Sequence, residues 1–329
     1  MASVKVGSGS LQYELIEDWE QAPAGWEHPD VAAVATDSQS RVYLFCRNNP
    51  PIWIYDRDGK FLDSWGEGQF TARTHGMFID GDQLLWLVDD ADHTARKYTL
   101  DGKLLLTLGN SKVASDTGYT GKVESIARGA PPFNRPTNVV VHPDGSLYAS
   151  DGYGNCRVHH FSSEGRLLHS WGDPGTGDGC FHTPHGIWVH RDGRVFVADR
   201  ENDRIQIFSP AGEYLDQWLD VQRPCDIYMD GKGLVFVSEL VKRKGYVSPR
   251  LGPAEEEQPS RISIYDEQGQ LLLRWGGLDA AAPGNFVAPH DIWVDAHGDI
   301  YVAEVTETIG VRSGHVPRGT HTFQKWARI

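Results

Sequence analysis

The stretch GIWVHRDGRVFVADRENDRIQIFSPAGEYLDQW, residues 186–218, contains four short runs of β-branched and aromatic residues, separated by polar turn sequences, two of which contain glycine. Runs of this composition, divided by such turns, are typical of antiparallel strands. A unit of four strands in about 40 residues has the size of one blade of a β-propeller. The stretch therefore predicts one such blade.

The same pattern recurs along the whole chain. The segment NVVVHPDGSLYASDGYGNCRVHHFSSEGRLLHSWG (138–172) repeats it closely, and four more units align with these two. We therefore predict an all-β protein, a six-bladed β-propeller of four-stranded antiparallel blades, with residues 1–329 forming a single domain. The predicted blades cover about 31–66, 74–109, 133–172, 181–218, 222–277 and 286–329.

The last predicted blade lacks a fourth strand. The N-terminal segment YELIEDWEQ (13–21) has strand character, so we expect it to complete that blade and close the propeller. Closure of this kind removes an exposed strand edge that would otherwise favour aggregation. Two separate β-sandwich domains are the alternative, and the regular spacing of the repeats argues against them.

Composition excludes several classes of partner. The net charge is −14 and no basic run stands out, which argues against nucleic acid and anionic membrane surfaces. The chain has no run of about 18 apolar residues, so the sequence predicts no transmembrane helix. The N-terminus lacks the charged-then-apolar pattern of a signal peptide, and the four cysteines are scattered without a Cys-x-x-Cys pair. The sequence therefore predicts a cytoplasmic protein with reduced thiols.

Three histidines stand at the same point of three predicted blades. The equivalent positions at the start of the six first strands are Ala32, His75, Thr137, His185, Cys225 and His290. The histidines belong to alternate blades, so their side chains would face the propeller axis from three sides. Three neutral imidazoles suit a zinc ion and leave a fourth position for water or substrate. The alternative is that they only pack the repeat, in which case histidine should occur at every blade or at random ones.

Other polar residues are expected at the same mouth of the propeller. The ends of the second strands and the loops after them would present Arg47, Tyr153, Arg200, Glu201 and Glu239. A tyrosine beside a metal ion can act as a general base, because the ion and a nearby arginine both favour the phenolate. Three longer segments, 110–132, 242–260 and 306–319, open on this face, where binding often lies. Segment 242–260 is expected to be either a lid or a disordered surface loop.

The sequence resembles the six-bladed NHL-type propeller of the peptidyl-α-hydroxyglycine α-amidating lyase family. The resemblance covers roughly residues 30–329 and is strongest at FNRPTNVVV (133–141), SDGYGNCR (150–157), PHGIWV (184–189), VADRENDRIQIF (197–208) and PHDIWV (289–294). It implies a catalytic zinc ion held by His75, His185 and His290. It also implies that Tyr153 is the catalytic tyrosine and Arg47 an active-site arginine.

The resemblance further implies a structural calcium ion on the axis. Its ligands would be the main-chain oxygens of Val34 and Met77 and the carboxylate of Asp291, a hard oxygen set that suits calcium. Secreted members of the family carry two disulfides, and neither can form here, because the matching positions are Asn134, Gly154, Phe196 and Ile207. A methionine of the family site is Ala288 in this chain, so the substrate contacts are expected to differ.

The expected function is that of a zinc-dependent carbon–nitrogen lyase. Its substrate would be an N-substituted α-hydroxyglycine, or a similar small-molecule or peptide carbinolamide, which is cleaved to an amide and glyoxylate. Zinc would make the substrate hydroxyl more acidic, Tyr153 would take its proton, and Arg47 would stabilise the negative charge. Substrate contacts are also expected from Arg200, Glu201 and Glu239.

Two alternatives stay open at this stage. A metal-dependent hydrolase on the same mouth would attack with activated water, and Glu239 or Glu201 would be its base. A non-catalytic NHL-type propeller would only present a binding surface to a partner, and it would not need the three histidines.

Overall fold

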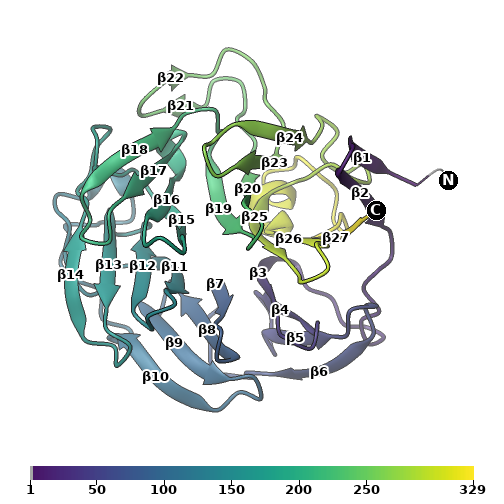
Figure 1. Ribbon diagram of the computed structural model, residues 1–329, viewed down its shortest axis with the longest axis horizontal. Coiled ribbons are helices and arrows are strands. Elements are labelled where there is room, and N and C mark those ends of the chain that lie inside the picture. The colour runs from purple at the N-terminus through teal and green to yellow at the C-terminus, as the bar shows by residue number, and fades with distance from the viewer. Residues whose placement is uncertain (1–2) are drawn as a thin grey trace. The chain divides into compact units, whose positions relative to one another are not determined.

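The computed structural model describes residues 3–329, in which nearly all of the regular secondary structure consists of antiparallel strands (Figure 1). The fold is a six-bladed β-propeller of four-stranded antiparallel sheets, which confirms the predicted fold class. By its contacts the chain divides into two compact units. The first contains the described residues up to Gln69 together with 228–244 and 255–329, and the second contains 70–227 and 245–254. Within residues 3–329, no helix is long and apolar enough to cross a membrane.

The second unit contains three complete blades, each a sheet whose four strands follow one another in chain order. The strands are β7 (Thr74–Ile79), β8 (Leu84–Asp89), β9 (Thr94–Thr99), β10 (Leu104–Gly109), β11 (Pro136–Val141), β12 (Leu147–Asp151), β13 (Arg157–Phe161), β14 (Leu167–Trp171), β15 (Pro184–Val189), β16 (Val195–Asp199), β17 (Arg204–Phe208) and β18 (Tyr214–Trp218). Strand β11 contacts both β7 and β15, so the starts of these three first strands lie close together (Figure 1).

The first unit contains two complete sheets. One consists of β3 (Val31–Thr36), β4 (Val42–Cys46), β5 (Ile52–Tyr55) and β6 (Phe61–Trp65). The other consists of β25 (Pro289–Val294), β26 (Ile300–Glu304), β27 (Phe323–Arg328), β2 (Leu11–Ile16) and β1 (Lys5–Ser8). Strand β2 pairs with β27, so an N-terminal strand takes the fourth place of this sheet.

The N-terminal strand differs from the expected segment 13–21 in two ways. Strand β2 ends at Ile16, because the chain turns at Asp18, which adopts a left-handed conformation with φ of 53°. Strand β1 then pairs with the outer side of β2, so this sheet has five strands instead of the expected four.

The remaining sheet is formed by β19 (Pro224–Met229), β20 (Leu234–Glu239), β23 (Arg261–Asp266) and β24 (Leu271–Trp275). Between β20 and β23 lies the segment 242–260, for which the sequence left a lid or a disordered loop open. It carries a small antiparallel hairpin of β21 (Val247–Ser248) and β22 (Gly252–Pro253).

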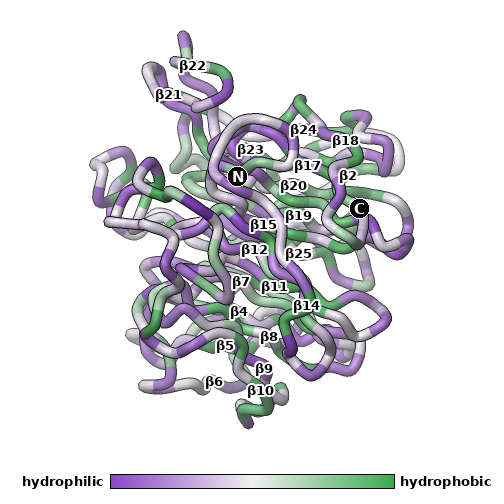
Figure 2. The backbone as a smooth tube through the Cα atoms, turned by 90° about the vertical axis from the view of Figure 1, so that its left-hand side faces the viewer, coloured by the Kyte–Doolittle hydropathy of each residue, from purple (hydrophilic) through white to green (hydrophobic). Residues whose placement is uncertain are grey.

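Apolar side chains hold the blades of the second unit against each other. Successive residues of a strand point to opposite faces of its sheet. In β11, Val139 packs in a cluster with Trp86 and Phe133, whereas Val140 packs in a second cluster with Ile187 and Phe208. Because both faces of the sheet are covered, the hydrophobic residues concentrate in the strands, and many turns are hydrophilic (Figure 2).

Carboxylates at the ends of the second strands fix the loops that lead into the first strands. Each of these carboxylates accepts a hydrogen bond from a backbone N–H group of such a loop. Asp89 accepts from Thr71 at 2.7 Å, Asp151 from Asn134 at 2.8 Å and Asp199 from His182 at 2.8 Å. All three carboxylates are buried. They hold the starts of β7, β11 and β15 in place, which is where the candidate site residues lie.

Candidate metal centre

His75 and His185 are the second residues of β7 and β15, and both are buried. Their ring centroids lie 4.7 Å apart. Nδ1 of His75 lies 2.5 Å from the carbonyl oxygen of Thr137, and Nδ1 of His185 lies 2.8 Å from that of Cys225. A carbonyl oxygen only accepts hydrogen bonds, so Nδ1 of each ring carries the proton and Nε2 keeps its lone pair. In this form an imidazole can bind a metal ion through Nε2.

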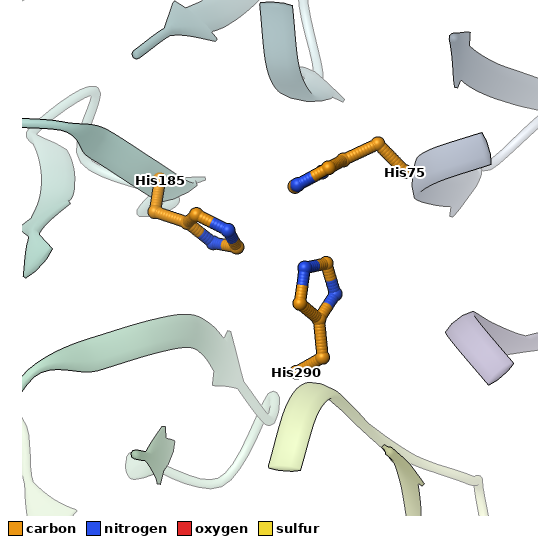
Figure 3. A group of neighbouring side chains, drawn as sticks. All are labelled: His75, His185 and His290. Atoms are coloured by element: carbon orange, nitrogen blue, oxygen red, sulfur yellow. The ribbon is translucent and has the colours of Figure 1, made fainter. Parts of the chain in front are cut away.

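His290 is the equivalent residue of β25 in the first unit. Its Nδ1 lies 2.7 Å from the carbonyl oxygen of Ala32, which fixes the same tautomer. The ligand nitrogens of His75, His185 and His290 all lie within 4.8 Å of one another, and all three side chains are buried (Figure 3). The three histidines therefore sit close enough to hold a metal ion. Three imidazoles in one tautomer fit zinc or another ion that accepts nitrogen ligands.

Tyr153 lies two residues after the end of β12, and its hydroxyl touches two of these histidines. The oxygen lies 3.1 Å from Nε2 of His75 and 3.0 Å from Nε2 of His185. The hydroxyl has one proton, so it can donate to only one of two nitrogens that both present lone pairs. Nitrogens that present lone pairs can also bind a cation. The donor set therefore fits a metal ion with a tyrosine beside it.

Close packing places Tyr153 at this point. A Cβ on the preceding Gly152 would lie 2.0 Å from the carbonyl oxygen of Pro184, the residue before His185. Only glycine allows the chain after β12 to approach β15 so closely. The Ser-Asp-Gly-Tyr motif is thus explained by packing as well as by chemistry.

Three guanidinium groups surround the ring of Tyr153. The Cζ atoms of Arg73, Arg135 and Arg200 lie 5.6, 5.6 and 5.3 Å from the ring centroid. Nη1 of Arg200 also donates a hydrogen bond to the Tyr153 oxygen at 3.2 Å. Three nearby positive charges stabilise negative charge on that oxygen, which is the property a tyrosine base requires.

Asp90 is the shared partner of Arg73 and Arg135. Its carboxylate is fully buried, and its oxygens lie 2.7 Å from Nη2 of Arg73 and 2.8 Å from Nη2 of Arg135. Burial alone would lower the pKa of both arginines, but the charge of Asp90 outweighs burial and raises the pKa of each. One carboxylate therefore faces two permanent cations, which leaves this side of the site positively charged.

Glu201 links Arg200 to Arg223. Its Oε1 accepts from Nε of Arg200 at 2.7 Å and from Nη2 of Arg223 at 3.1 Å, and its Oε2 accepts from Nε of Arg223 at 3.1 Å. Burial alone would raise the pKa of Glu201, but the charges of Arg200 and Arg223 outweigh it and hold the pKa far below its ordinary value. The carboxylate therefore stays ionised at neutral pH and would be a weak general base.

Two other residues expected at the site have different surroundings. Nη1 of Arg47 lies 3.4 Å from the carboxylate of Asp30 and 3.2 Å from the hydroxyl of Thr308, and its role as an active-site arginine stays a prediction. Glu239 is fully buried at the end of β20 and accepts from Arg261 at 2.8 Å. Glu239 is the last residue of the second strand of its sheet, the position that Asp151 and Asp199 occupy in theirs.

The proposed calcium ligands lie in the first strands. In the first unit, Oδ1 of Asp291 accepts a hydrogen bond from the backbone N–H of Val34 at 3.1 Å. Met77 lies in β7 of the second unit. Calcium binding by Val34, Met77 and Asp291 stays a prediction.

Arg73 and Arg135 are not predicted at the site from the sequence, although their positions in the repeat indicate them. Both stand two residues before the aligned first-strand position, His75 in one blade and Thr137 in the next. Arg223 has the same offset from Cys225. An alignment extended by two residues would have predicted arginines around the site from three blades.

The positions that match the family disulfides are neighbours in space. A Cβ on Gly154 would lie 2.1 Å from the side chain of Asn134, and Phe196 is paired with Ile207 across β16 and β17. The four cysteines of the chain are free thiols.

Comparison with known proteins gives two kinds of relative. An NHL repeat is matched at residues 181–208. The chain is 31% identical to NHL repeat-containing protein 3 of Homo sapiens over 308 residues, which cover 85% of this chain and 80% of that protein. It is 29% identical over 270 residues to peptidyl-alpha-hydroxyglycine alpha-amidating lyase 1 of Drosophila melanogaster, covering 75% of this chain and 45% of that protein. A solved gluconolactonase structure from Xanthomonas campestris shares the fold with a TM-score of 0.60 at 14% identity, covering 99% of this chain and 97% of that one.

Proposed function

Because the chain belongs to the NHL repeat family and some of its relatives are named as amidating lyases, we propose that it is a metal-dependent carbon–nitrogen lyase. Its substrate would be an N-substituted α-hydroxyglycine or a similar carbinolamide, either a small molecule or a peptide. The observation that supports this best is the position of Tyr153, whose oxygen lies within 3.2 Å of Arg200 and of two candidate metal ligands. A base held beside a Lewis acid is what removal of a hydroxyl proton requires.

The reaction collapses a carbon that carries both a hydroxyl group and an amide nitrogen. His75, His185 and His290 would hold a zinc ion, which supplies Lewis acidity toward the substrate hydroxyl. Tyr153, as phenolate, takes the hydroxyl proton. The carbon–oxygen bond becomes a carbonyl while the carbon–nitrogen bond breaks, and Tyr153 returns the proton to the leaving amide nitrogen. An amide and glyoxylate result, and no oxidant or reductant is consumed.

The arginines around Tyr153 would bind the carboxylate of the substrate. Arg73 keeps a third of its side chain exposed, and Arg135 about a quarter, while Asp90 is shared between them. Guanidinium groups bind carboxylates through paired, charge-assisted hydrogen bonds. Arg200 would hold the charge of the Tyr153 oxygen as the proton moves.

A hydrolase on the same site is the less favoured reading. Its expected bases are already engaged, Glu201 by Arg200 and Arg223, and Glu239 by Arg261. A carboxylate whose pKa lies far below its ordinary value accepts protons poorly at neutral pH.

The test uses metal analysis together with product analysis of N-benzoyl-α-hydroxyglycine. The wild-type chain should bind one zinc ion and release benzamide and glyoxylate. His185→Ala should lose both properties. His297→Ala is the matched control, because His297 is exposed in the turn between β25 and β26 and should behave like wild type.

The possible results separate the alternatives. Benzoate in place of benzamide would show hydrolysis of the amide bond instead of lyase chemistry. Failure of the wild-type chain to bind zinc, after purification without chelators and addition of the ion, would contradict the metal centre and favour a binding propeller.

A further inference from the structure

The hairpin of β21 and β22 docks onto the short 3₁₀ turn that carries Arg200. This turn spans Arg200–Asn202 and directly follows β16. Within the second unit, the hydroxyl of Ser248 donates to the carbonyl oxygen of Glu201 at 3.2 Å. Nε of Arg250 donates to the carbonyl oxygen of Asn202 at 2.6 Å, and its Nη2 to that of Asp203 at 2.9 Å. Three side-chain hydrogen bonds thus tie the hairpin to the backbone of the turn.

Tyr246 adds a contact to the side chains of the turn. Its hydroxyl donates a hydrogen bond to Oε2 of Glu201, and the guanidinium of Arg223 lies over its ring at 4.6 Å from the centroid. Each oxygen of Glu201 therefore accepts two hydrogen bonds, one from Arg223 and one from either Arg200 or Tyr246. A carboxylate with both oxygens satisfied in this way has little freedom to rotate.

These contacts form a continuous path to the candidate base. Tyr246 donates to Glu201, Glu201 accepts from Nε of Arg200, and Nη1 of Arg200 donates to the oxygen of Tyr153. A free arginine side chain has several rotatable bonds, so ordering it costs conformational entropy. A second layer of hydrogen bonds removes most of that freedom before substrate binds.

We propose that the 242–260 insertion is a positioning element of the site and that Tyr246 is its key positioning residue. Tyr246 fixes Glu201, and Glu201 holds Arg200 against the Tyr153 oxygen. The hairpin thus acts as a fixed strap on the turn. The inference rests on the proposed function for its catalytic consequence, but the docking of the hairpin can be tested without catalysis.

Tyr246→Phe is the primary variant, because it removes the hydroxyl and keeps the ring beneath Arg223. We expect kcat to fall roughly tenfold, the effect of losing one charge-assisted hydrogen bond, with KM and zinc content near wild type. Val247→Ala is the control, because Val247 is the next residue and is 64% exposed. It should leave kcat, KM and zinc content unchanged.

A double-mutant cycle separates positioning from a general structural effect. If Tyr246 acts through Arg200, Tyr246→Phe should cause no further loss in an Arg200→Ala background. Equal losses of kcat in both backgrounds would overturn the proposal. So would wild-type kcat in Tyr246→Phe.

Hydrogen exchange tests the strap independently of turnover. The amides of Arg200 and Glu201 are bonded to the carbonyl oxygens of Thr183 and His182. These amides should exchange faster in Tyr246→Phe and at the wild-type rate in Val247→Ala. Unchanged exchange in Tyr246→Phe would overturn the proposal. Absence of glyoxylate release from the wild-type chain, with the exchange result as expected, would count against the proposed function alone.

Discussion

The oxygen of Tyr153 lies 3.0 Å from Nε2 of His185. The contact joins the loop after the second strand of one blade to the first strand of the next blade in the second unit. Because the Nδ1 atom of His185 is held by the Cys225 carbonyl, the nitrogen that faces Tyr153 is the one with a lone pair. The proposed proton transfer at Tyr153 and the proposed metal binding by His185 would thus be coupled by geometry.

Removal of the Tyr153 hydroxyl should separate the two roles. Tyr153→Phe keeps the ring beneath the three arginines but removes the hydroxyl proposed to take the proton. We expect kcat to fall by a factor of about 100 to 10,000, the usual range for loss of a general base. Zinc content should stay near one per chain, because His75 and His185 keep their carbonyl partners.

Steady-state kinetics and metal analysis on the same preparation measure both effects. Tyr214→Phe, on outer strand β18, is the control and should match wild type. If Tyr153→Phe retained full activity, the assignment of the base would be wrong.

Asp90→Asn should destabilise the fold because it leaves two arginines without their shared charge. Breaking a fully buried ion pair typically costs about 3–5 kcal/mol. A third of Arg73 is exposed, and solvent screening weakens such pairs, so we expect a smaller loss of about 2 kcal/mol in the free energy of unfolding.

Urea unfolding gives this value directly if the slope of the transition is unchanged. Asp144→Asn provides the comparison, since the Asp144 side chain is 63% exposed, and it should cost much less. Equal stability of the two variants would show that Asp90 does not neutralise the arginines.

Ionisation of Glu201 should make the stability of the fold depend on pH over a defined range. Its folded-state pKa lies far below the ordinary value of 4.5, because Arg200 and Arg223 outweigh burial. A depressed folded pKa contributes stability that is complete above the unfolded pKa and is lost as pH falls toward the folded value. The difference in melting temperature between wild type and Glu201→Gln should therefore be constant from about pH 8 to 6 and shrink below about pH 4.5.

Melting curves across this range, with Glu213→Gln on an exposed turn as control, test the sign. A difference that grows as the pH falls would mean that Glu201 is not held ionised by the two arginines.

The sequence predicts the blades and the three histidines for one reason, which is that both repeat. His75, His185 and His290 stand at equivalent strand positions, so the period alone brings them to corresponding places. Arg73 and Arg135 lie outside the strands, so an alignment restricted to the strands omits them, although both stand two residues before the aligned first-strand position. The contact of Tyr246 with Glu201 joins residues 45 apart, and the inserted segment has no repeat to align it. Such tertiary contacts depend on how a hairpin docks, which local patterns do not determine.

Gly186→Ala should weaken metal binding without touching a ligand. A Cβ at Gly186 would lie 2.6 Å from the carbonyl oxygen of Cys225 and 2.6 Å from Cα of Asp226. Backbone atoms cannot move aside as a flexible side chain can, so β15 and the start of β19 must separate. The Cys225 carbonyl is also the partner of Nδ1 of His185, so the added methyl group should disturb the orientation of that imidazole. Loss of such an outer partner typically reduces metal affinity about 10- to 100-fold.

Competition with a zinc chelator measures the change, and Gly231→Ala serves as the control because a Cβ there meets no atom within 4 Å. Wild-type zinc affinity in Gly186→Ala would mean that the Cys225 carbonyl does not orient His185 for metal binding.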